Sequence, residues 1–169
     1  MFLTRLVRNG RLIRRSRGLY TLPDHEPTEN TDLAAVAKRS PSAAICLLSA
    51  LRFHGLTTQN PFEVWVLIDR KSRPPVMKHP RLRIIRASGV ALSRGVELHE
   101  IEGVRVRVTT PAKTVADCFK YRGTVGTDVA VEALRDCWRQ RKATADEIHD
   151  FAKIDRVANV MRPYLESIV

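Results

Sequence analysis

Positively charged side chains gather in two segments of this sequence, and their chemistry is that of phosphate binding. Residues 1–23 contain six arginines and no acidic residue, and residues 70–94 contain eight basic residues and no acidic residue. The whole chain of 169 residues has 29 Lys and Arg against 18 Asp and Glu, a net charge of +11. Concentrated charge of one sign repels itself unless a polyanion neutralises it, and arginine suits bidentate contacts to phosphate and guanine. The pattern predicts a nucleic-acid partner, with a basic surface that only aids solubility as the alternative.

The first basic segment also has the periodicity of a short helix followed by a hairpin. Residues 2–9 place apolar side chains on one face and polar ones on the other, and Gly10 follows where a helix can end. Residues 12–22 are typical of two short strands around a turn at 15–18. A helix followed by an arginine-tipped hairpin indicates the second half of a winged helix, whose recognition helix enters the major groove while the wing touches the backbone. The alternative is a basic helix and hairpin that simply pack on the main domain. The predicted DNA contacts are Thr4, Arg5, Arg8, Asn9, Arg11, Arg14, Arg15 and Arg17.

The second basic segment begins in a stretch that is expected to be a loop. Residues 69–80 contain three prolines, which disfavour a continuous strand or helix. We expect the positive side chains of this region to form a secondary basic surface. Its members are Arg70, Lys71, Arg73, Lys78, Arg81, Arg83 and Arg86.

A second candidate chemistry lies where this loop begins. Asp69 and Lys71 follow an apolar run, and an acidic residue two positions before a lysine at a strand end is typical of restriction-type nucleases. In such enzymes carboxylates hold Mg²⁺ and the lysine steadies the attacking water. Glu63 begins the same strand about 20 Å away, so Glu100 on a later strand is the remaining candidate for the second carboxylate. The alternative is a solvated turn within a basic loop.

No other motif points to catalysis. The chain has no glycine-rich phosphate loop and no GxSxG, HExxH or CxxC motif, and none of its five histidines lies at metal-ligand spacing from a cysteine or another histidine. We therefore expect no metal, no cofactor and no enzymatic activity. His54 is expected to cap a helix or to hydrogen-bond in the core. Thr110 and Pro111 are expected to start a helix on which Lys113 and Asp117 form a weak surface pair.

The periodicity of the chain predicts the class α+β. We expect a partial winged helix at the N-terminus, made of a recognition helix and a hairpin wing, followed by a mixed-sheet domain with several packed helices. Asp32 is expected to cap a helix that begins at residue 33, and Gly55 is expected to end the next one. The further helices are predicted at 33–39, 42–54, 111–121, 127–141, 144–153 and 157–167. The further strands are predicted at 62–68, 82–85, 98–101 and 104–109, with a tight turn at Glu102 and Gly103.

The cysteines and the apolar runs indicate the compartment. Cys46, Cys118 and Cys137 are odd in number and far apart, so we expect buried, reduced thiols in a cytoplasmic protein. No apolar run approaches the ~20 residues that cross a bilayer. Arginines interrupt every apolar stretch near the N-terminus, unlike a signal peptide.

Five blocks of the sequence, in the same order along the chain, resemble the AbiEi antitoxins of type IV toxin–antitoxin systems. The blocks are RGLYTLPD (17–24), LLSALRFHGLTTQNPFEVWVLIDR (47–70), TPAKTVADCFKYRG (110–123), VEALRDCWRQRK (131–142) and VMRPYLE (160–166). The resemblance implies an N-terminal winged helix that represses its own operon by binding inverted repeats in double-stranded DNA. It also implies a C-terminal domain that counteracts an AbiEii-type nucleotidyltransferase toxin in phage defence, without requiring a stable complex.

The pattern of elements and the resemblance together predict how the chain divides. The expected parts are a partial winged-helix segment at 1–24, a linker and connecting helix at 25–41, and a C-terminal α+β antitoxin domain at 42–169. Family members have further helices before the position of Met1, so we expect an N-terminally shortened winged helix. A late gene start, natural shortening or trimming of the expressed protein would each account for it. A protein-binding antitoxin that no longer binds DNA and a Mg-dependent nuclease are the alternative functions.

Overall fold

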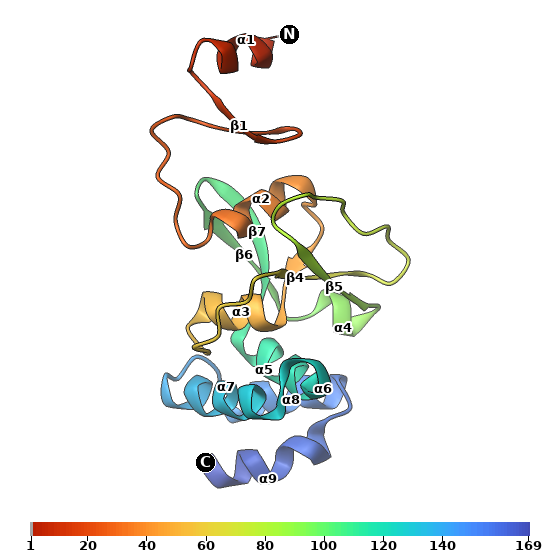
Figure 1. Cartoon of the computed structure of the whole chain (residues 1–169). Helices are drawn as coiled ribbons and strands as arrows, with labels where there is room; N and C mark the ends of the chain where they lie inside the picture. The colour runs from red at the N-terminus through yellow and green to blue at the C-terminus, as the bar shows by residue number, and fades with distance from the viewer. Residues whose placement is uncertain (1) are drawn as a thin grey trace.

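The computed structural model describes residues 2–169, and within that range it contains nine helices and two sheets (Figure 1). Met1, where the predicted winged-helix segment begins, lies outside the described residues. The helices are α1 (Phe2–Arg8), α2 (Thr31–Arg39), α3 (Leu47–His54), α4 (Val90–Ser93), α5 (Pro111–Lys120), α6 (Arg122–Val125), α7 (Thr127–Arg139), α8 (Ala145–Ile154) and α9 (Ala158–Ile168). The strands are β1 (Ile13–Ser16), β2 (Leu19–Thr21), β3 (Ala44–Ile45), β4 (Val64–Asp69), β5 (Leu82–Ala87), β6 (Val96–Ile101) and β7 (Val104–Thr109). The predicted α+β class is confirmed.

The larger sheet has five strands in the order β5-β4-β3-β7-β6. Strand β4 runs parallel to β5, and β3 runs parallel to β7, whereas the pairs β3–β4 and β6–β7 are antiparallel. The sheet is therefore mixed, as the sequence predicts. The turn between β6 and β7 consists of Glu102 and Gly103, both at positive φ (51° and 76°), which is the backbone form of a two-residue hairpin turn.

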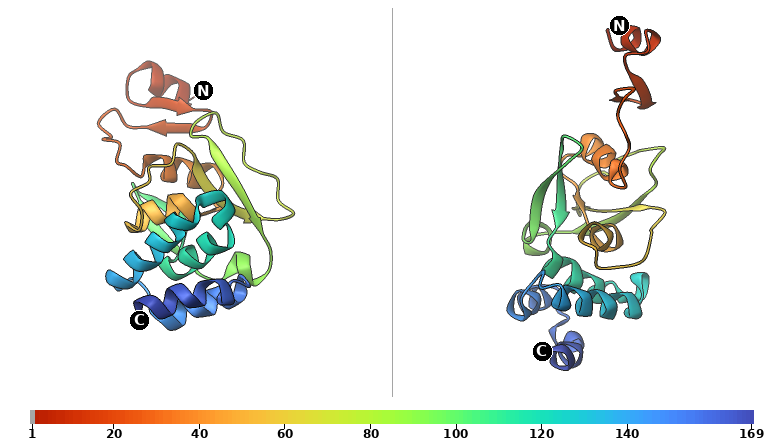
Figure 2. Two further views of the ribbon diagram at one scale, coloured as in Figure 1. Left: turned by 60° about the horizontal axis from the view of Figure 1, so that its bottom comes forward. Right: turned by 90° about the vertical axis from the view of Figure 1, so that its left-hand side faces the viewer.

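Helices cover both faces of the five-stranded sheet, with α2 on one face and the group of α5, α7 and α8 on the other (Figures 1 and 2). The side chains of β4 alternate between two hydrophobic cores, one on each face of the sheet. Val66 packs with residues of α2, whereas Trp65 and Leu67 pack with residues of α5. Because side chains alternate across a strand, a strand buried on both faces reads as a continuous apolar run. This double burial explains why residues 64–68 are apolar throughout.

One predicted helix is wrong at its start. The sequence predicts a helix over 42–54, but residues 44–45 form strand β3 in the middle of the sheet, and α3 begins only at Leu47. The stretch from Ala43 to Leu47 is almost fully buried, so its apolar side chains show no periodicity that separates a strand from a helix. The predicted end is confirmed, because Gly55 caps α3 in the left-handed conformation (φ 71°).

The cap of α2 also differs from the prediction, whereas that of α5 agrees with it. Helix α2 begins at Thr31 with Asn30 as its N-cap, so Asp32 lies inside the first turn instead of capping it. Thr110 caps α5, and its hydroxyl oxygen accepts a hydrogen bond from the backbone N–H of Lys113 at 3.3 Å. Helices α4 and α6 span four residues each, which is too short for a periodic sequence pattern to predict them.

Lys113 and Asp117 form a buried pair, which corrects the predicted weak surface pair. Their side chains are 2% and 7% exposed, and Lys113 Nζ lies 3.3 Å from Asp117 Oδ1. Lys113 Nζ also donates to the carbonyl oxygen of Ala91 at 2.7 Å, which ties α4 to α5. Burial and the neighbouring Asp155 carboxyl raise the pKa of Asp117 well above its ordinary value, although the positive charge of Lys113 opposes this.

The predicted roles of His54 and of the cysteines agree with the structure. His54 is buried, and its Nε2 hydrogen-bonds with the carbonyl oxygen of Thr109 at 2.7 Å. Cys46, Cys118 and Cys137 are buried free thiols. Burial raises the pKa of Cys137 to about 11. No helix in residues 2–169 combines the length and the apolar character that a membrane span needs.

Helix α1 and the β1–β2 hairpin lie together at one end of the molecule, opposite α7, α8 and α9 (Figures 1 and 2). The predicted helix and hairpin are both present, while their identity as part of a winged helix stays a prediction. Helix α1 has no buried residue, and Phe2 and Leu3 are 74% and 45% exposed. The polar side of α1 is therefore open to solvent and not packed against the body.

Candidate nucleic-acid interface

The β1–β2 hairpin directs neighbouring arginines into two different hollows. Its strands pair antiparallel, with Arg14 opposite Tyr20, and an irregularity in register follows Arg14. The chain turns at Arg17 and Gly18, and Gly18 adopts a φ of 78° that a side chain would disfavour. Strand β1 thus extends further along the chain than the sequence predicts, and the turn is shorter than the predicted 15–18. Arg14 and Arg17 line one hollow, and Arg15 lines the other.

The first hollow, here called the basic groove, has a volume of about 580 Å³ and runs between the hairpin, α2 and the loop that follows β4. Its lining residues are Arg14, Arg17, Gly18, Leu19, Ala35, Lys38, Arg39, Val76, Met77 and Lys78. Five of these carry a positive charge and none carries a negative one. The fold therefore brings the two basic segments of the sequence to a common site, since the hairpin belongs to the first and Lys78 to the second.

Hydrogen bonds from arginine side chains to backbone carbonyl oxygens hold the loop wall of the basic groove in place. Arg39 Nε donates to the carbonyl oxygen of Val76 at 3.3 Å, which joins α2 to the loop. At the base of the loop, Arg86 Nη1 donates to the carbonyl oxygens of Arg70 and Ser72 at 3.0 and 2.8 Å. Because these bonds satisfy backbone acceptors, the loop has a defined path although most of its side chains are exposed.

The charge in the basic groove is not balanced by the protein itself. None of its five cationic side chains forms an ion pair with a carboxylate among residues 2–169. Lys38 and Arg39 occupy the last turn of α2, where the helix dipole offsets part of their repulsion. The remaining repulsion is relieved when phosphates enter the groove, and arginine binds phosphate bidentately. The arrangement thus favours a polyanionic ligand.

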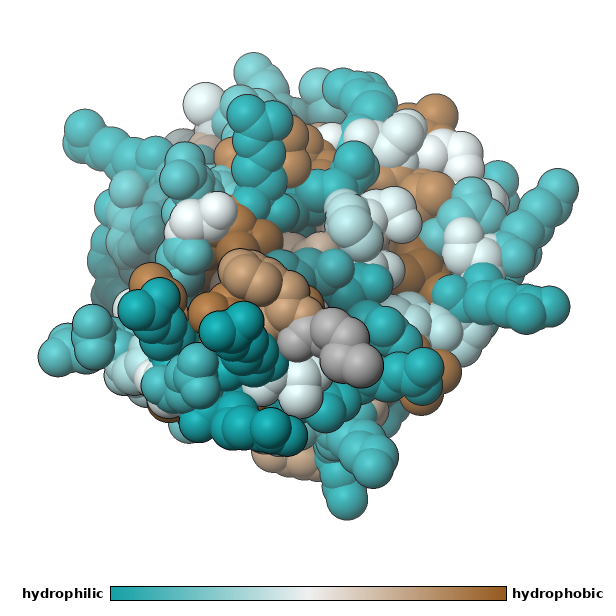
Figure 3. All heavy atoms as spheres, turned by 90° about the horizontal axis from the view of Figure 1, so that it is seen from above, coloured by the Kyte–Doolittle hydropathy of each residue, from teal (hydrophilic) through white to brown (hydrophobic). Residues whose placement is uncertain are grey.

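The other predicted DNA contacts lie outside the basic groove but at the same end of the molecule. Figure 3 looks down on this end, where hydrophilic side chains surround apolar patches and project outward. The exposed predicted contacts on α1 and in the segment after it are Thr4, Arg5, Arg8, Asn9 and Arg11. They offer a second polar surface beside the hairpin.

The residues of the predicted secondary basic surface do not share one environment. Lys78 joins the basic groove, whereas Arg70, Lys71, Arg73 and Arg81 are exposed without lining it. Arg83 stacks over the ring of Trp65, with 5.2 Å between the guanidinium carbon and the ring centroid. Arg86 donates hydrogen bonds to backbone carbonyl oxygens of the loop. The surface is therefore less uniform than the charge count suggests.

Lys38 and Arg39 belong to the interface but were not predicted from the sequence. Both were visible only as the basic last turn of a predicted helix, which is an ordinary feature of helix C-termini. Their place beside the hairpin depends on how α2 packs on the sheet, and no local pattern encodes that packing.

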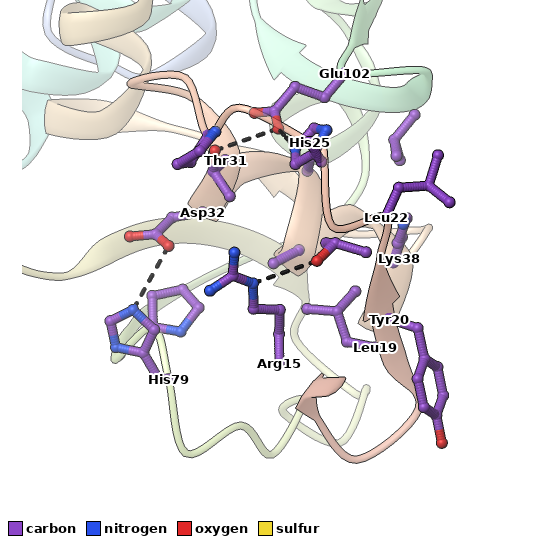
Figure 4. A pocket seen from close by; sticks show the side chains of 16 residues that line it. Arg15, Leu19, Tyr20, Leu22, His25, Thr31, Asp32, Lys38, His79 and Glu102 are labelled. Atoms are coloured by element: carbon purple, nitrogen blue, oxygen red, sulfur yellow. Dashed lines mark hydrogen bonds and ion pairs between the residues drawn. The ribbon is translucent and has the colours of Figure 1, made fainter. Parts of the chain in front are cut away.

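The second hollow, here called the apolar cleft, has a volume of about 610 Å³ and lies on the other side of the hairpin (Figure 4). Its polar groups meet in two pairs: His79 Nε2 lies 3.6 Å from Asp32 Oδ1, and the His25 ring contacts Glu102. Arg15 extends into the middle of the cleft, and its Nε donates to the hydroxyl oxygen of Thr21 at 3.3 Å. Leu19, Ala35 and Lys38 line both hollows, which are therefore neighbours.

Glu102 ties the segment between the hairpin and α2 to the β6–β7 turn. The hydroxyl of Thr28 donates to Glu102 Oε2 at 2.7 Å, and that of Thr31 donates to Oε1 at 3.2 Å. The Glu102 side chain is 8% exposed. Burial opposes its charge, but the hydrogen bonds from Thr28, Thr31 and His25 outweigh burial and lower the pKa of Glu102. This carboxylate therefore helps to fix the hairpin relative to the body.

Replacing Glu102 with Gln should lower the free energy of unfolding by about 1–2 kcal/mol at pH 7, because hydrogen bonds to an ionised acceptor are lost. The pKa of Glu102 is lowered on folding, so its contribution is present above the unfolded-state pKa near 4.5 and is lost as the pH falls through the folded-state value. Urea denaturation of both proteins between pH 3 and pH 7 measures this. A stability difference that stays constant down to pH 3 would contradict the role of the charge.

The predicted nuclease pairing is wrong. Asp69 ends β4, and Glu100 lies in β6 at the far side of the sheet, with β3 and β7 between them. Three strand spacings separate them by about 14 Å, so their carboxylates cannot share a metal ion. Asp69 Oδ1 instead accepts a hydrogen bond from the backbone N–H of Lys71 at 2.7 Å, as in a solvated turn. Across residues 2–169, no three His, Cys, Asp or Glu side chains come together as metal ligands.

Comparison with known proteins adds no family assignment to this geometry. No protein-family model matches the chain, and no curated protein matches it. The AbiEi resemblance therefore continues to rest on the sequence blocks alone.

Proposed function

We propose that this protein is a cytoplasmic DNA-binding regulator, a transcriptional autorepressor and antitoxin of a type IV toxin–antitoxin pair. It binds double-stranded DNA through α1, the hairpin and the basic groove. The observation that carries the proposal is the basic groove itself, in which cations from two distant segments meet without a carboxylate partner in the described chain. Binding of a polyphosphate backbone accounts for this arrangement more simply than solubility does.

The two parts of the interface are suited to different contacts. The basic groove presents closely spaced cations to the DNA backbone, which supplies affinity but no sequence reading. Helix α1 has an exposed polar face with Arg5 and Arg8, and arginine is the side chain that most often reads guanine in the major groove. We therefore expect the basic groove to position the protein on the duplex and α1 to recognise the bases.

The antitoxin part of the proposal rests on the AbiEi resemblance. Its functional partner is an AbiEii-type nucleotidyltransferase toxin encoded beside it, which the C-terminal domain counteracts without requiring a stable complex. Co-expression with the neighbouring toxin tests this part, and growth that is no better than with the toxin alone would overturn it.

The experiment for DNA binding compares the affinity for a duplex from upstream of the gene with that for a scrambled duplex. Replacing Arg5 and Arg8 with Ala should weaken binding to the upstream duplex by about 1–3 kcal/mol for each guanine that is no longer recognised, and should reduce the preference over the scrambled duplex. A matched control replaces Arg135 and Arg162, exposed arginines of α7 and α9, with Ala.

Each outcome of this experiment decides between the candidates. Unchanged affinity after the α1 substitutions removes the assigned recognition surface. Absence of any DNA shift in the parent protein, together with co-purification of the toxin, would instead identify a purely protein-binding antitoxin. The exposed Phe2 and Leu3 on α1 would then be the first residues to change in that complex.

A further inference from the structure

The apolar cleft and the basic groove differ in chemistry although they adjoin each other beneath the hairpin. The cleft has apolar walls that include Leu22, Pro80 and Val104, whereas five of the ten residues that line the groove are cationic and none is acidic. Lys38 lines both and stands where they meet. Each hollow lies within the range of roughly 300–1,000 Å³ that is usual for small-molecule sites.

Polar groups suited to an aromatic heterocycle project into the apolar cleft. The His79 side chain is 82% exposed and the Asp32 side chain 50% exposed, and their 3.6 Å separation leaves both able to contact a ligand. Arg15 uses only Nε on Thr21, so within the described chain its two terminal amino groups have no hydrogen bond. A guanidinium and an imidazole stack on the face of a base, and a carboxylate accepts from an exocyclic amino group.

We propose that the two hollows together form a nucleotide site, with the phosphates in the basic groove and the base in the apolar cleft. Arg14, Arg17 and Lys38 hold the phosphates, because all three line the basic groove and Lys38 also lines the adjoining cleft. The base lies against the apolar wall that includes Val104, with Arg15 stacked on its face. Asp32 lies at its edge and accepts from an exocyclic amino group (Figure 4). No covalent step is involved.

The site goes beyond duplex binding and has a consequence for it. Double-stranded DNA keeps its bases stacked in the helix, so a base enters the apolar cleft only from a free nucleotide or from an unpaired nucleotide of a strand. Since Arg14 and Arg17 belong to both surfaces, a bound nucleotide and a bound duplex exclude each other. The basic groove then responds to nucleotide concentration.

Isothermal titration of the full chain with ATP, inorganic triphosphate and adenosine tests the two-part site. We expect ATP to bind at least tenfold more tightly than either inorganic triphosphate or adenosine. Val104→Trp fills the apolar cleft, which is the base end of the site. This variant should bind ATP no more tightly than triphosphate, while its affinity for triphosphate stays unchanged. Arg17→Gln should weaken ATP and triphosphate equally. Arg15→Leu, at an exposed position, provides a second base-end variant if Val104→Trp does not fold.

The source of the nucleotide is distinguished with a single-stranded tetranucleotide. A tetranucleotide that binds more tightly than ATP, and loses that advantage in Val104→Trp, identifies an unpaired strand, and the reverse order identifies a free nucleotide. Triphosphate binding as tight as ATP binding, or ATP binding unaffected by both base-end variants, overturns the proposal. Duplex affinity measured on the same proteins separates this result from the DNA-binding proposal, because Val104→Trp should not alter it.

Discussion

Replacing Lys113 with Met should lower the free energy of unfolding at pH 8 by about 3–5 kcal/mol, since removal of one partner leaves a buried charge uncompensated. Lys113 is 2% exposed, and its ammonium group is shared between Asp117 and the carbonyl oxygen of Ala91. The loss should become smaller as the pH falls. The pKa of Asp117 is already raised on folding, so this carboxyl favours the folded state when protonated and opposes it as the pH rises through the folded-state value.

Urea denaturation at pH 5 and pH 8 measures this effect, and a double variant controls it. Adding Asp117→Asn to Lys113→Met removes the charge that was left without a partner, so it should restore most of the stability lost at pH 8. A double variant no more stable than the single one would show that Lys113 acts only by filling space.

Neutralising three cations of the basic groove should weaken duplex binding by on the order of 100-fold to 1,000-fold at 0.1 M salt, because each phosphate that is no longer neutralised retains roughly one counterion. The variant is Arg14→Gln, Arg17→Gln and Lys78→Gln, which takes residues from both basic segments. The loss should be nearly the same for upstream and scrambled duplexes, since phosphate contacts carry no sequence information. Fluorescence anisotropy of labelled duplexes provides the affinities.

A variant with the same change in net charge isolates the effect of position. Arg135, Arg156 and Arg162 are exposed in the helical part of the chain, which lies opposite the hairpin (Figure 1). Changing these three to Gln should leave affinity within about threefold, since charges beyond a Debye length are largely screened. Similar losses in the two triple variants would mean that total charge, and not the groove, determines binding.

The elements with strong local signals were predictable from the sequence. Alternating valines in β7, the Glu102–Gly103 turn and the Thr110 cap each depend on neighbours along the chain, and the structure has all three. Strand β3 was not predictable. Its two residues take their extended form from strands on both sides, which are distant in sequence.

The candidate interface could be predicted in its composition but not in its shape. Charge clustering identified Arg14, Arg17 and Lys78, because a surplus of one sign is visible without any structure. Lys38 and Arg39 depended on the packing of α2, and the nuclease pairing failed because strand order decides which carboxylates meet. The burial of Lys113 was missed for the same reason: an i, i+4 pair has the same spacing on a solvated and on a buried helix face.

The central claim is that cations of the hairpin and of the body act together on the DNA backbone, and the salt dependence of duplex affinity tests it most directly. The slope of log affinity against log salt concentration counts the phosphates neutralised, at about 0.9 for each contact on a duplex. We predict that the groove variant has a slope smaller than that of the parent by about 2.7, while the distant triple variant keeps the parental slope. Equal slopes for the groove variant and the parent would contradict the claim.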